Sequence, residues 1–431
     1  MKYLKEQATQ RLPHIKKHIT SSLFLMYDFL NAGNINSFYK LAKEANRENH
    51  QIGQKQVSAY LKYWGMDEQL TRNPLMSKSD IKEWASKINI KRVKSWAYTG
   101  GSYGEPLRVP YSSKRVLVRT ATFKYFGEKA GYSLGDSIAI IRAKSRSSFI
   151  QFLRNEVVIK PFDVSDENLE KIIELLINKK VVMLSGYPTV MYDLALFLKS
   201  HPYYKTHLRI DNLLSVSEML ASEKRAVVKH EFGCNFIDRY SNEEVGLIAQ
   251  QENYNGEYHL NKFGIVTEVL DANTLEPSKT GELGKVVVTD LNNDLIPVVR
   301  YDTGDLAIAG EYIGNQLQTL QRIEGRTAEK IMNTIGVPIS SLALGPTIYK
   351  PLAQGGYLVQ FQLAQTALAT YELRIKLAKQ PISNSVLEKI EINLREKLGR
   401  EAKIIIKLVD EIKAQPSGKR PMYKNEIPQV S

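Results

Sequence analysis

The sequence predicts an α/β protein in which a large domain with mainly parallel sheets is followed by a small, mobile α+β domain. Two observations predict this class. Between residue 93 and about residue 320, short β-rich runs alternate with helical stretches, which is typical of a largely parallel sheet. The last hundred residues change to two strand-like runs, one helix and a further strand. We expect a helical segment over 1–90 that packs on a large α/β domain over 91–324, and a small C-terminal domain over 325–431.

The individual elements follow from hydrophobic periodicity and capping signals. In the N-terminal segment, residues 20–31 and 36–49 have helical periodicity, and Ser77–Asp80 caps the next helix. In the large domain we expect strands at 137–141, 181–184, 212–217, 235–238 and 285–289, and helices at 113–131, 165–179, 189–200 and 221–232. In the last domain we expect strands at 357–363, 369–376 and 403–409, with a helix over 384–398.

The composition excludes several classes of protein. The chain has 431 residues, 43% hydrophobic and 24% charged, which is typical of a globular protein with a large core. Its one cysteine, Cys234, excludes an internal disulfide and a cysteine-based zinc cluster. The sequence lacks a membrane-spanning run and a signal-peptide core, so we expect a cytoplasmic protein. The net charge of +13 comes from scattered residues, which favours attraction of anionic substrates over nucleic-acid binding.

A glycine-rich loop is the first candidate for chemistry. It consists of Thr99, Gly100, Gly101, Ser102, Tyr103, Gly104, Glu105 and Pro106, with a strand-like run on each side. Glycines let backbone N–H groups converge on an anion, and hydroxyl groups add donors, so the loop suits a phosphate. The sequence after Gly104 lacks the Lys-Ser/Thr of a P-loop, which disfavours that class of NTPase. The alternative is a turn that carries no ligand.

A second candidate is the segment 238–246, which follows a predicted strand. It places Tyr240 four residues ahead of Glu244. Ligands of α/β sheets bind at the carboxyl ends of parallel strands, where an aromatic ring can stack on a base and a carboxylate can hold Mg²⁺. The alternative is an acidic helix N-terminus that complements the helix dipole.

Two further clusters carry a carboxylate and a lysine. In the segment 300–306, Asp305 follows Thr-Gly and could accept hydrogen bonds from ribose hydroxyls, whereas a type I turn in a hairpin is the alternative. In the segment 416–420, a glycine turn presents Lys419, whose ammonium can neutralise charge on a transferring phosphate. The alternative there is a solvent-exposed basic turn.

The order of these motifs resembles that of the adenylate-forming superfamily. Within it, the chain is most similar to the phenylacetate–coenzyme A ligase family and its CapK-like branch of capsular-polysaccharide biosynthesis. The segments 73–80, 185–189 and 215–220 also match in place, and the resemblance covers about residues 70 to 425.

The resemblance implies an enzyme that uses ATP and Mg²⁺ to turn a small carboxylic acid into an acyl-adenylate. The acyl group would then pass to coenzyme A, a carrier protein or another nucleophile, in polysaccharide or secondary-metabolite biosynthesis. The loop from Thr99 to Gly104 would hold the β- and γ-phosphates, Glu244 would ligate Mg²⁺ and Lys419 would catalyse adenylation. The nucleoside would contact Ser217, Glu218, Met219, Arg239, Tyr240, Ser241, Asp305 and Arg326.

Several positions depart from the family pattern. Glu105 stands where lysine is common, Glu243 replaces a serine or threonine, and Ser241 replaces a glycine. Ala328 stands where the hinge acid is expected. These departures keep two alternatives open: a catalytically degenerate fold that acts as a basic binding protein, and an acyl-protein synthetase. The identity of the acid, the acceptor and the oligomeric state do not follow from the sequence.

Overall fold

The computed structural model describes residues 35–98, 107–143, 145–220, 222–326, 331–339, 344, 347–348, 350–352, 357–377, 381–413 and 421–427. The chain divides into two compact units. The large unit comprises residues 1–303 and 307–322, and the small unit comprises residues 304–306 and 323–431. The predicted helix at 20–31 lies outside the described residues.

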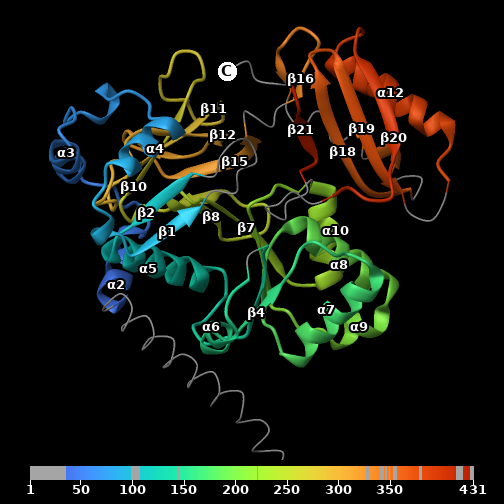
Figure 1. The fold of residues 1–431 in the computed structure, drawn as a ribbon, viewed down its shortest axis with the longest axis horizontal. Coiled ribbons are helices and arrows are strands. Elements are labelled where there is room, and N and C mark those ends of the chain that lie inside the picture. Colours follow the sequence, from blue (N-terminus) through green and yellow to red (C-terminus); the bar gives the residue numbers. More distant parts are fainter. Residues whose placement is uncertain are drawn as a thin grey trace, which may run out of the picture. The chain divides into compact units, whose positions relative to one another are not determined.

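The large unit is built on an 11-stranded sheet (Figure 1). Five strands pair in parallel, namely β7 (Asn235–Asn242), β6 (Asn212–Val216), β5 (Met183–Gly186), β3 (Ile138–Ile141) and β4 (Glu156–Ile159). The sheet continues through β8 (Gly246–Gln251), β9 (Tyr258–Leu260), β15 (Thr319–Arg326), β12 (Tyr301–Ala309), β11 (Leu283–Asp290) and β10 (Ile265–Leu270). Because β7–β8, β8–β9, β9–β15 and β10–β11 are antiparallel, the predicted α/β class is confirmed with a mixed sheet.

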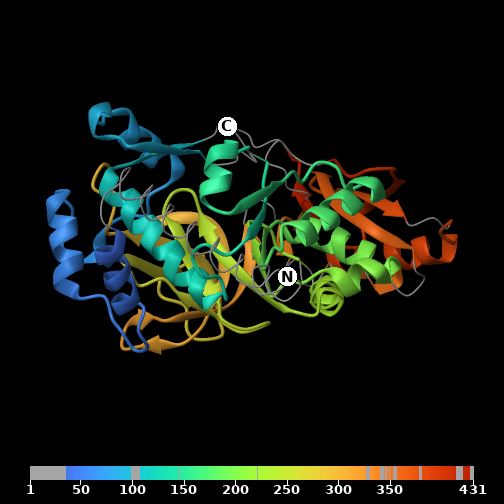
Figure 2. The same cartoon turned by 90° about the horizontal axis from the view of Figure 1, so that it is seen from below.

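Helices cover both faces of the parallel strands. On one face, α7 (Asp166–Asn178), α8 (Pro188–Ser200) and α10 (Ser222–Phe232) bury an apolar cluster that includes Ile173, Leu194 and Phe236. The other face is covered by α5 (Ser113–Lys129), where the Gln250 side chain donates to the Phe126 carbonyl over 2.8 Å. Helix α2 (Ile35–Ala45) lies beside α5 (Figure 1 and Figure 2).

The shorter elements follow local sequence signals. Helix α4 (Lys78–Ser86) begins with a capping box between Ser77 and Asp80, as the sequence predicts. Strands β1 (Ser95–Tyr98) and β2 (Arg108–Tyr111) form an antiparallel pair on either side of the glycine-rich loop. The remaining short elements of the large unit are α3 (Gln54–Tyr63), α6 (Ser148–Leu153), α9 (Pro202–His207), two 3₁₀ turns at 70–72 and 90–92, and the pair β13 (Tyr312–Ile313) and β14 (Gln316–Leu317).

The small unit is an α+β structure with its own core. Its four-stranded sheet has the order β20 (Lys403–Leu408), β19 (Thr370–Leu377), β18 (Leu358–Ala367) and β21 (Tyr423–Asn425). Helix α12 (Asn384–Leu398) packs Ile390, Leu394 and Leu398 into the cluster that this sheet helps to form. A two-stranded pair, β16 (Ile331–Met332) and β17 (Pro338–Ile339), completes the described elements. In the described parts of both units, no helix is long and apolar enough to cross a bilayer.

Candidate active site

The loops that follow β3, β5, β6 and β7 converge at the carboxyl ends of the parallel strands. The surroundings of Tyr187, directly after β5, are evidence for this convergence, because charged groups of the neighbouring loops act on its hydroxyl. Burial raises the pKa of its hydroxyl, and so do the charges of Glu218 after β6 and Glu243 after β7. Arg142, directly after β3, opposes that shift. Three of these loops therefore bring charged groups, and the loop after β5 brings a tyrosine hydroxyl, to the edge of the sheet at which α/β folds hold ligands.

The loop after β6 is tied to the start of α8. The Thr189 hydroxyl donates to Glu218 Oε2 over 2.7 Å, which joins the two sequence motifs at 185–189 and 215–220. Ser217 has a left-handed backbone with φ of 70°. A non-glycine residue in that region is strained, and such strain is concentrated at functional sites. Met219 follows Glu218 and is half-buried, so the three residues predicted to line the adenine pocket form one constrained turn.

Glu244 lies in the turn between β7 and β8, and its side chain is buried. Its Oε1 accepts a hydrogen bond of 2.9 Å from the hydroxyl of Tyr301, the first residue of β12. Among the described residues, no lysine or arginine forms an ion pair with Glu244, and no cluster of three metal-binding side chains occurs. The turn joins two strands, so the alternative of a helix N-terminus is wrong.

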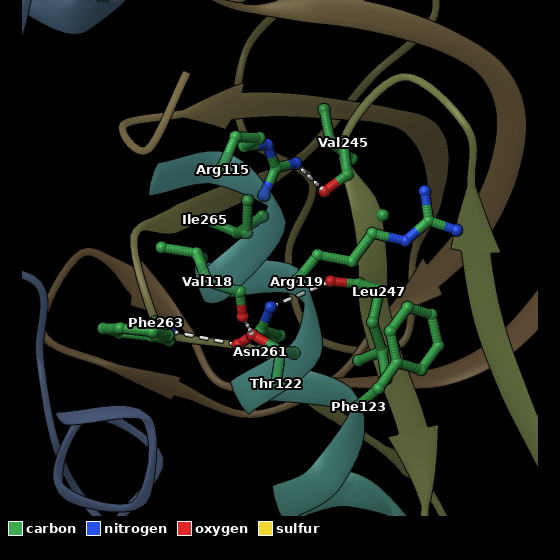
Figure 3. A pocket seen from close by; sticks show the side chains of 11 residues that line it. Arg115, Val118, Arg119, Thr122, Phe123, Val245, Leu247, Asn261, Phe263 and Ile265 are labelled. Carbon is green, nitrogen blue, oxygen red and sulfur yellow. Dashed lines mark hydrogen bonds between the residues drawn. The ribbon is translucent and has the colours of Figure 1, made fainter. Parts of the chain in front are cut away.

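Two arginines of α5, spaced four residues apart, contact the two ends of the segment 243–245; Figure 3 shows the contact of Arg115 with Val245. Arg115 donates to the Val245 carbonyl and forms a buried ion pair with Asp290, with 2.7 Å between nitrogen and oxygen. Arg119 lies 3.5 Å from Glu243 Oε2, and the Tyr111 hydroxyl donates to the Glu243 carbonyl over 2.6 Å. Glu243, which departs from the family pattern, therefore helps to anchor the turn that carries Glu244.

A small pocket lies behind this turn, between α5 and the antiparallel strands (Figure 3). Arg115, Arg119, Phe123 and Asn261 are among the residues that line it. Its volume of about 10 Å³ corresponds to one water molecule, so it is too small to hold an organic acid. The residues that line it include Arg115 and Arg119, so the pocket is part of the packing that holds the segment 243–245.

Tyr240 and Arg239 leave β7 on opposite faces of the sheet, as adjacent strand residues do. The Tyr240 hydroxyl lies 3.4 Å from Thr303 Oγ1 on β12. The Arg239 guanidinium lies over the Phe123 ring of α5, and its Nε donates to Gln250 Oε1 over 2.8 Å. A base that stacks on Tyr240 would therefore lie on the face of the sheet opposite to Arg239, and Arg239 could not contact it. Ser241 is half-buried beside Tyr240, at a break in the register with β8.

The segment that carries Asp305 is held by the segment 73–76. Residues 301–309 form one strand, so the alternative of a hairpin turn at Asp305 is wrong. Arg300 has a left-handed backbone and donates to the Asn73 carbonyl over 2.9 Å. The backbone of Met76 bonds to the Arg300 carbonyl and the Asp302 amide at 3.0 and 2.9 Å. Asp305 itself is buried within β12.

Several predicted site residues lie outside what the structure describes. These are Thr99, Gly100, Gly101, Ser102, Tyr103, Gly104 and Lys419, together with Ala328 of the hinge. Arg326 is the last residue of β15, and only its backbone is described. Two residues after Lys419, the Pro421 carbonyl accepts a hydrogen bond of 2.9 Å from Gln362 on β18.

Sequence reasoning missed the residues that support Glu244. Tyr301 was part of a recognised motif but had no predicted role, and its partner is 57 positions away in sequence. The spacing of Arg115 and Arg119 places both on one helix face, which was a usable signal. Nothing in the sequence indicated which turn they would reach. The supporting residues are thus defined by tertiary contacts.

No protein-family model matches the chain. It is 21% identical to Protein CapK of Staphylococcus aureus over 369 residues, which is 82% of this chain and 80% of CapK.

Solved structures show the same fold. One is a 2-hydroxyisobutyryl-CoA ligase in the postadenylation state with an acyl-AMP, with a TM-score of 0.63 and 16% identity over 96% of this chain and 90% of that chain. Another is ATP-bound MatB from Rhodopseudomonas palustris, with a TM-score of 0.53 and 17% identity over 76% of this chain and 66% of that chain. The resemblance predicted from the motifs is therefore confirmed at the level of the fold.

Proposed function

We propose that this chain, which has the fold of the adenylate-forming ligases, activates a carboxylic acid with ATP and passes the acyl group to an acceptor such as coenzyme A. The observation that carries the proposal is Glu244. It is a buried carboxylate without an ion-pair partner among the described residues, and it lies where four strand-end loops converge. Burying a carboxylate without a cation is unfavourable, so a cation is expected to complete this site.

The donor set fits Mg²⁺. This ion commonly binds proteins through one or two carboxylates and takes its other ligands from water and substrate phosphates. Glu244, oriented by Tyr301, would supply the protein ligand, and Mg²⁺ would lower the charge repulsion around the phosphates. The loop from Thr99 to Gly104 is proposed to hold the β- and γ-phosphates.

The roles proposed for the nucleoside contacts are those that the resemblance implies. We propose that Ser217, Glu218 and Met219 line the adenine pocket. The resemblance implies that Arg239 and Tyr240 cover the base; because the two lie on opposite faces of the sheet, we propose this role for Tyr240 alone, with Ser241 as a further nucleotide contact. Asp305 is proposed to accept hydrogen bonds from the ribose hydroxyls, and Arg326 to reach the ribose or a phosphate. These roles come from the resemblance. The constrained Ser217–Met219 turn and the buried positions of Tyr240 and Asp305 are compatible with them.

The chemistry needs positioning and charge stabilisation more than covalent participation by the protein. A substrate carboxylate oxygen attacks the α-phosphorus of ATP in line, the bond to the bridging oxygen breaks, and pyrophosphate leaves. Lys419 would stabilise the negative charge that develops on the phosphate oxygens. In the second step the acceptor nucleophile, such as a thiolate, displaces AMP from the acyl carbon.

The proposal can be tested with purified protein, Mg²⁺·ATP and a panel of carboxylic acids. We expect acid-dependent exchange of labelled pyrophosphate into ATP and trapping of the acyl group by hydroxylamine. Calorimetry with ATP gives a readout that does not require the correct acid. Absence of both ATP binding and exchange across the panel would contradict the proposal and favour a basic binding protein.

Lys419→Ala tests the role of the proposed catalytic lysine. We expect the rate of adenylation to fall by about 10²–10³-fold, because loss of a group that stabilises developing charge has effects of this size. ATP binding and the thermal midpoint should change little. Lys413→Ala is a charge-matched control, because Lys413 is exposed and lies six residues before Lys419 in the chain. Unchanged turnover in Lys419→Ala would refute the assigned role.

A further inference from the structure

Arg239 is a half-buried cation that forms no ion pair with a carboxylate among the described residues. Its Nη2 is inaccessible to solvent and has no hydrogen-bond partner among the described residues. Its Nε donates to Gln250 Oε1, and the residue as a whole is half-buried. Burial lowers the pKa of the guanidinium to about 9, and no neighbouring carboxylate counteracts that shift.

The more deeply buried arginines of the large unit are different, because each one faces a carboxylate. The pairs are Arg115–Asp290 at 2.7 Å, Arg225–Asp238 at 2.5 Å and Arg300–Glu268 at 3.3 Å. Removing a charge from water is costly unless a partner compensates it. Arg239 is therefore a half-buried cation that no carboxylate of the described part of the chain compensates.

The place of Arg239 in the sheet indicates what could compensate it. Arg239 pairs with Val216, the last residue of β6, and both lie on the face covered by α5. Strand β7 pairs in parallel with β6 and antiparallel with β8, so Arg239 lies where the parallel part of the sheet meets the antiparallel part. Glu244 follows five residues later, in the turn at the end of β7.

We infer that Arg239 receives a second anionic group of the acid substrate, distinct from the carboxylate that is activated. This inference rests on the proposed function and names its substrate class as dicarboxylic acids. The apolar surroundings, Phe123 and Val216, suit the carbon chain between the two carboxylates. A guanidinium binds a carboxylate through charge-assisted hydrogen bonds, which are strong when both groups are shielded from water. A monocarboxylate would leave Arg239 uncompensated.

The test is pyrophosphate exchange with matched pairs of acids: linear dicarboxylates of three to eight carbons, and monocarboxylates of the same lengths. We expect kcat/KM for the best dicarboxylate to exceed that of its partner by at least about 10²-fold, because sites with a buried polar group discriminate strongly against analogues that lack the complement. Arg239→Met should reverse the preference, and Arg239→Lys should retain part of it. Arg47→Met removes an exposed arginine outside the candidate site and serves as the charge-matched control.

Calorimetry with Mg²⁺·ATP and the thermal midpoint distinguish a contact with the acid from a contact with the nucleotide and from misfolding. If Arg239→Met keeps the preference for dicarboxylates, or if the wild type prefers monocarboxylates, the inference is wrong. If Arg239→Met instead weakens Mg²⁺·ATP binding in calorimetry and lowers exchange equally for all acids, Arg239 contacts the nucleotide and the inference is also wrong. Absence of ATP binding and of exchange with any acid in the wild type would overturn the proposed function itself. The thermal midpoint of Arg239→Met should not fall, which excludes misfolding as the cause of a changed preference.

Discussion

Lys224→Met should stabilise the large unit at neutral pH. Lys224 lies in α10 with only 3% of its surface exposed, and its ammonium is 4.7 Å from the centroid of the Tyr192 ring. Burial lowers its pKa from 10.5 to about 8, although the charge of Asp193 opposes the shift. Methionine has a similar length and no charge, so it removes the cause of the shift without creating a large cavity.

The magnitude follows from the pKa shift. The pKa falls from 10.5 to about 8, which at 1.36 kcal/mol per unit gives about 3 kcal/mol of destabilisation when the lysine is charged. Loss of the cation–π contact with Tyr192 cancels about 0.5–2 kcal/mol of the gain. We therefore expect the free energy of unfolding to rise by about 1–3 kcal/mol at pH 7.

The sign of the pH dependence distinguishes this explanation from a general packing effect. Between pH 8 and pH 10.5 the native lysine is neutral while the unfolded lysine still binds a proton. The unfolded state then binds more protons, so the wild type gains stability as the pH rises through this window. Below pH 8 the full penalty is present. The advantage of Lys224→Met should therefore disappear as the pH approaches 10.5.

Urea unfolding followed by tryptophan fluorescence is a suitable assay. All three tryptophans, Trp64, Trp84 and Trp96, belong to the large unit, which also contains Lys224. Lys229→Met, at an exposed position of the same helix, is the matched control; it also removes a cation–π contact, with Tyr254, and should lower stability by about 0.5–1 kcal/mol. An advantage for Lys224→Met that is equal at pH 7 and pH 10.5 would refute the reasoning, and so would a loss of stability at pH 7.

Two other predictions concern the turn and the loop. Arg115→Met should destabilise the large unit by about 3–5 kcal/mol in urea unfolding, because it leaves Asp290 buried without its partner. Arg115→Met combined with Asp290→Asn should recover part of this loss, and failure to do so would contradict the pairing argument. In the glycine-rich loop, Ser102→Ala should raise the KM for ATP more than Glu105→Ala, because the hydroxyl is a phosphate donor and the carboxylate is not. Parallel ATP titrations of pyrophosphate exchange would reveal the opposite order.

Local patterns predicted most of the regular elements. Helix α12 was predicted with the observed bounds, Asn384–Leu398, and α5 was predicted with the observed start at Ser113. These helices have continuous apolar faces and capping signals, which act over a few residues. The antiparallel strands after β7 were mostly missed, because buried strands of a mixed sheet lack the alternation that marks a half-exposed strand.

The candidate site shows where local reasoning ends. Tyr240 and Glu244 were recognised from their spacing, but the partner of Glu244 is Tyr301 on a distant strand. Arg239 was grouped with Tyr240, although the two-residue period of a strand already implies that neighbours face opposite sides. In the structure the two side chains lie on opposite faces, so Arg239 is proposed to contact the acid substrate and not the base.

The last described strand has a consequence for how the C-terminus is handled. Strand β21 pairs in parallel with the middle of β18 at Leu363, Ala364 and Gln365, and the Tyr423 ring packs edge-on against Phe361. Deleting the chain from Lys419 onward would also remove this strand and expose the backbone hydrogen-bonding groups of β18 as a free sheet edge, which promotes aggregation. Truncation is therefore an unsuitable way to remove the function of Lys419, because it would confound catalysis with solubility.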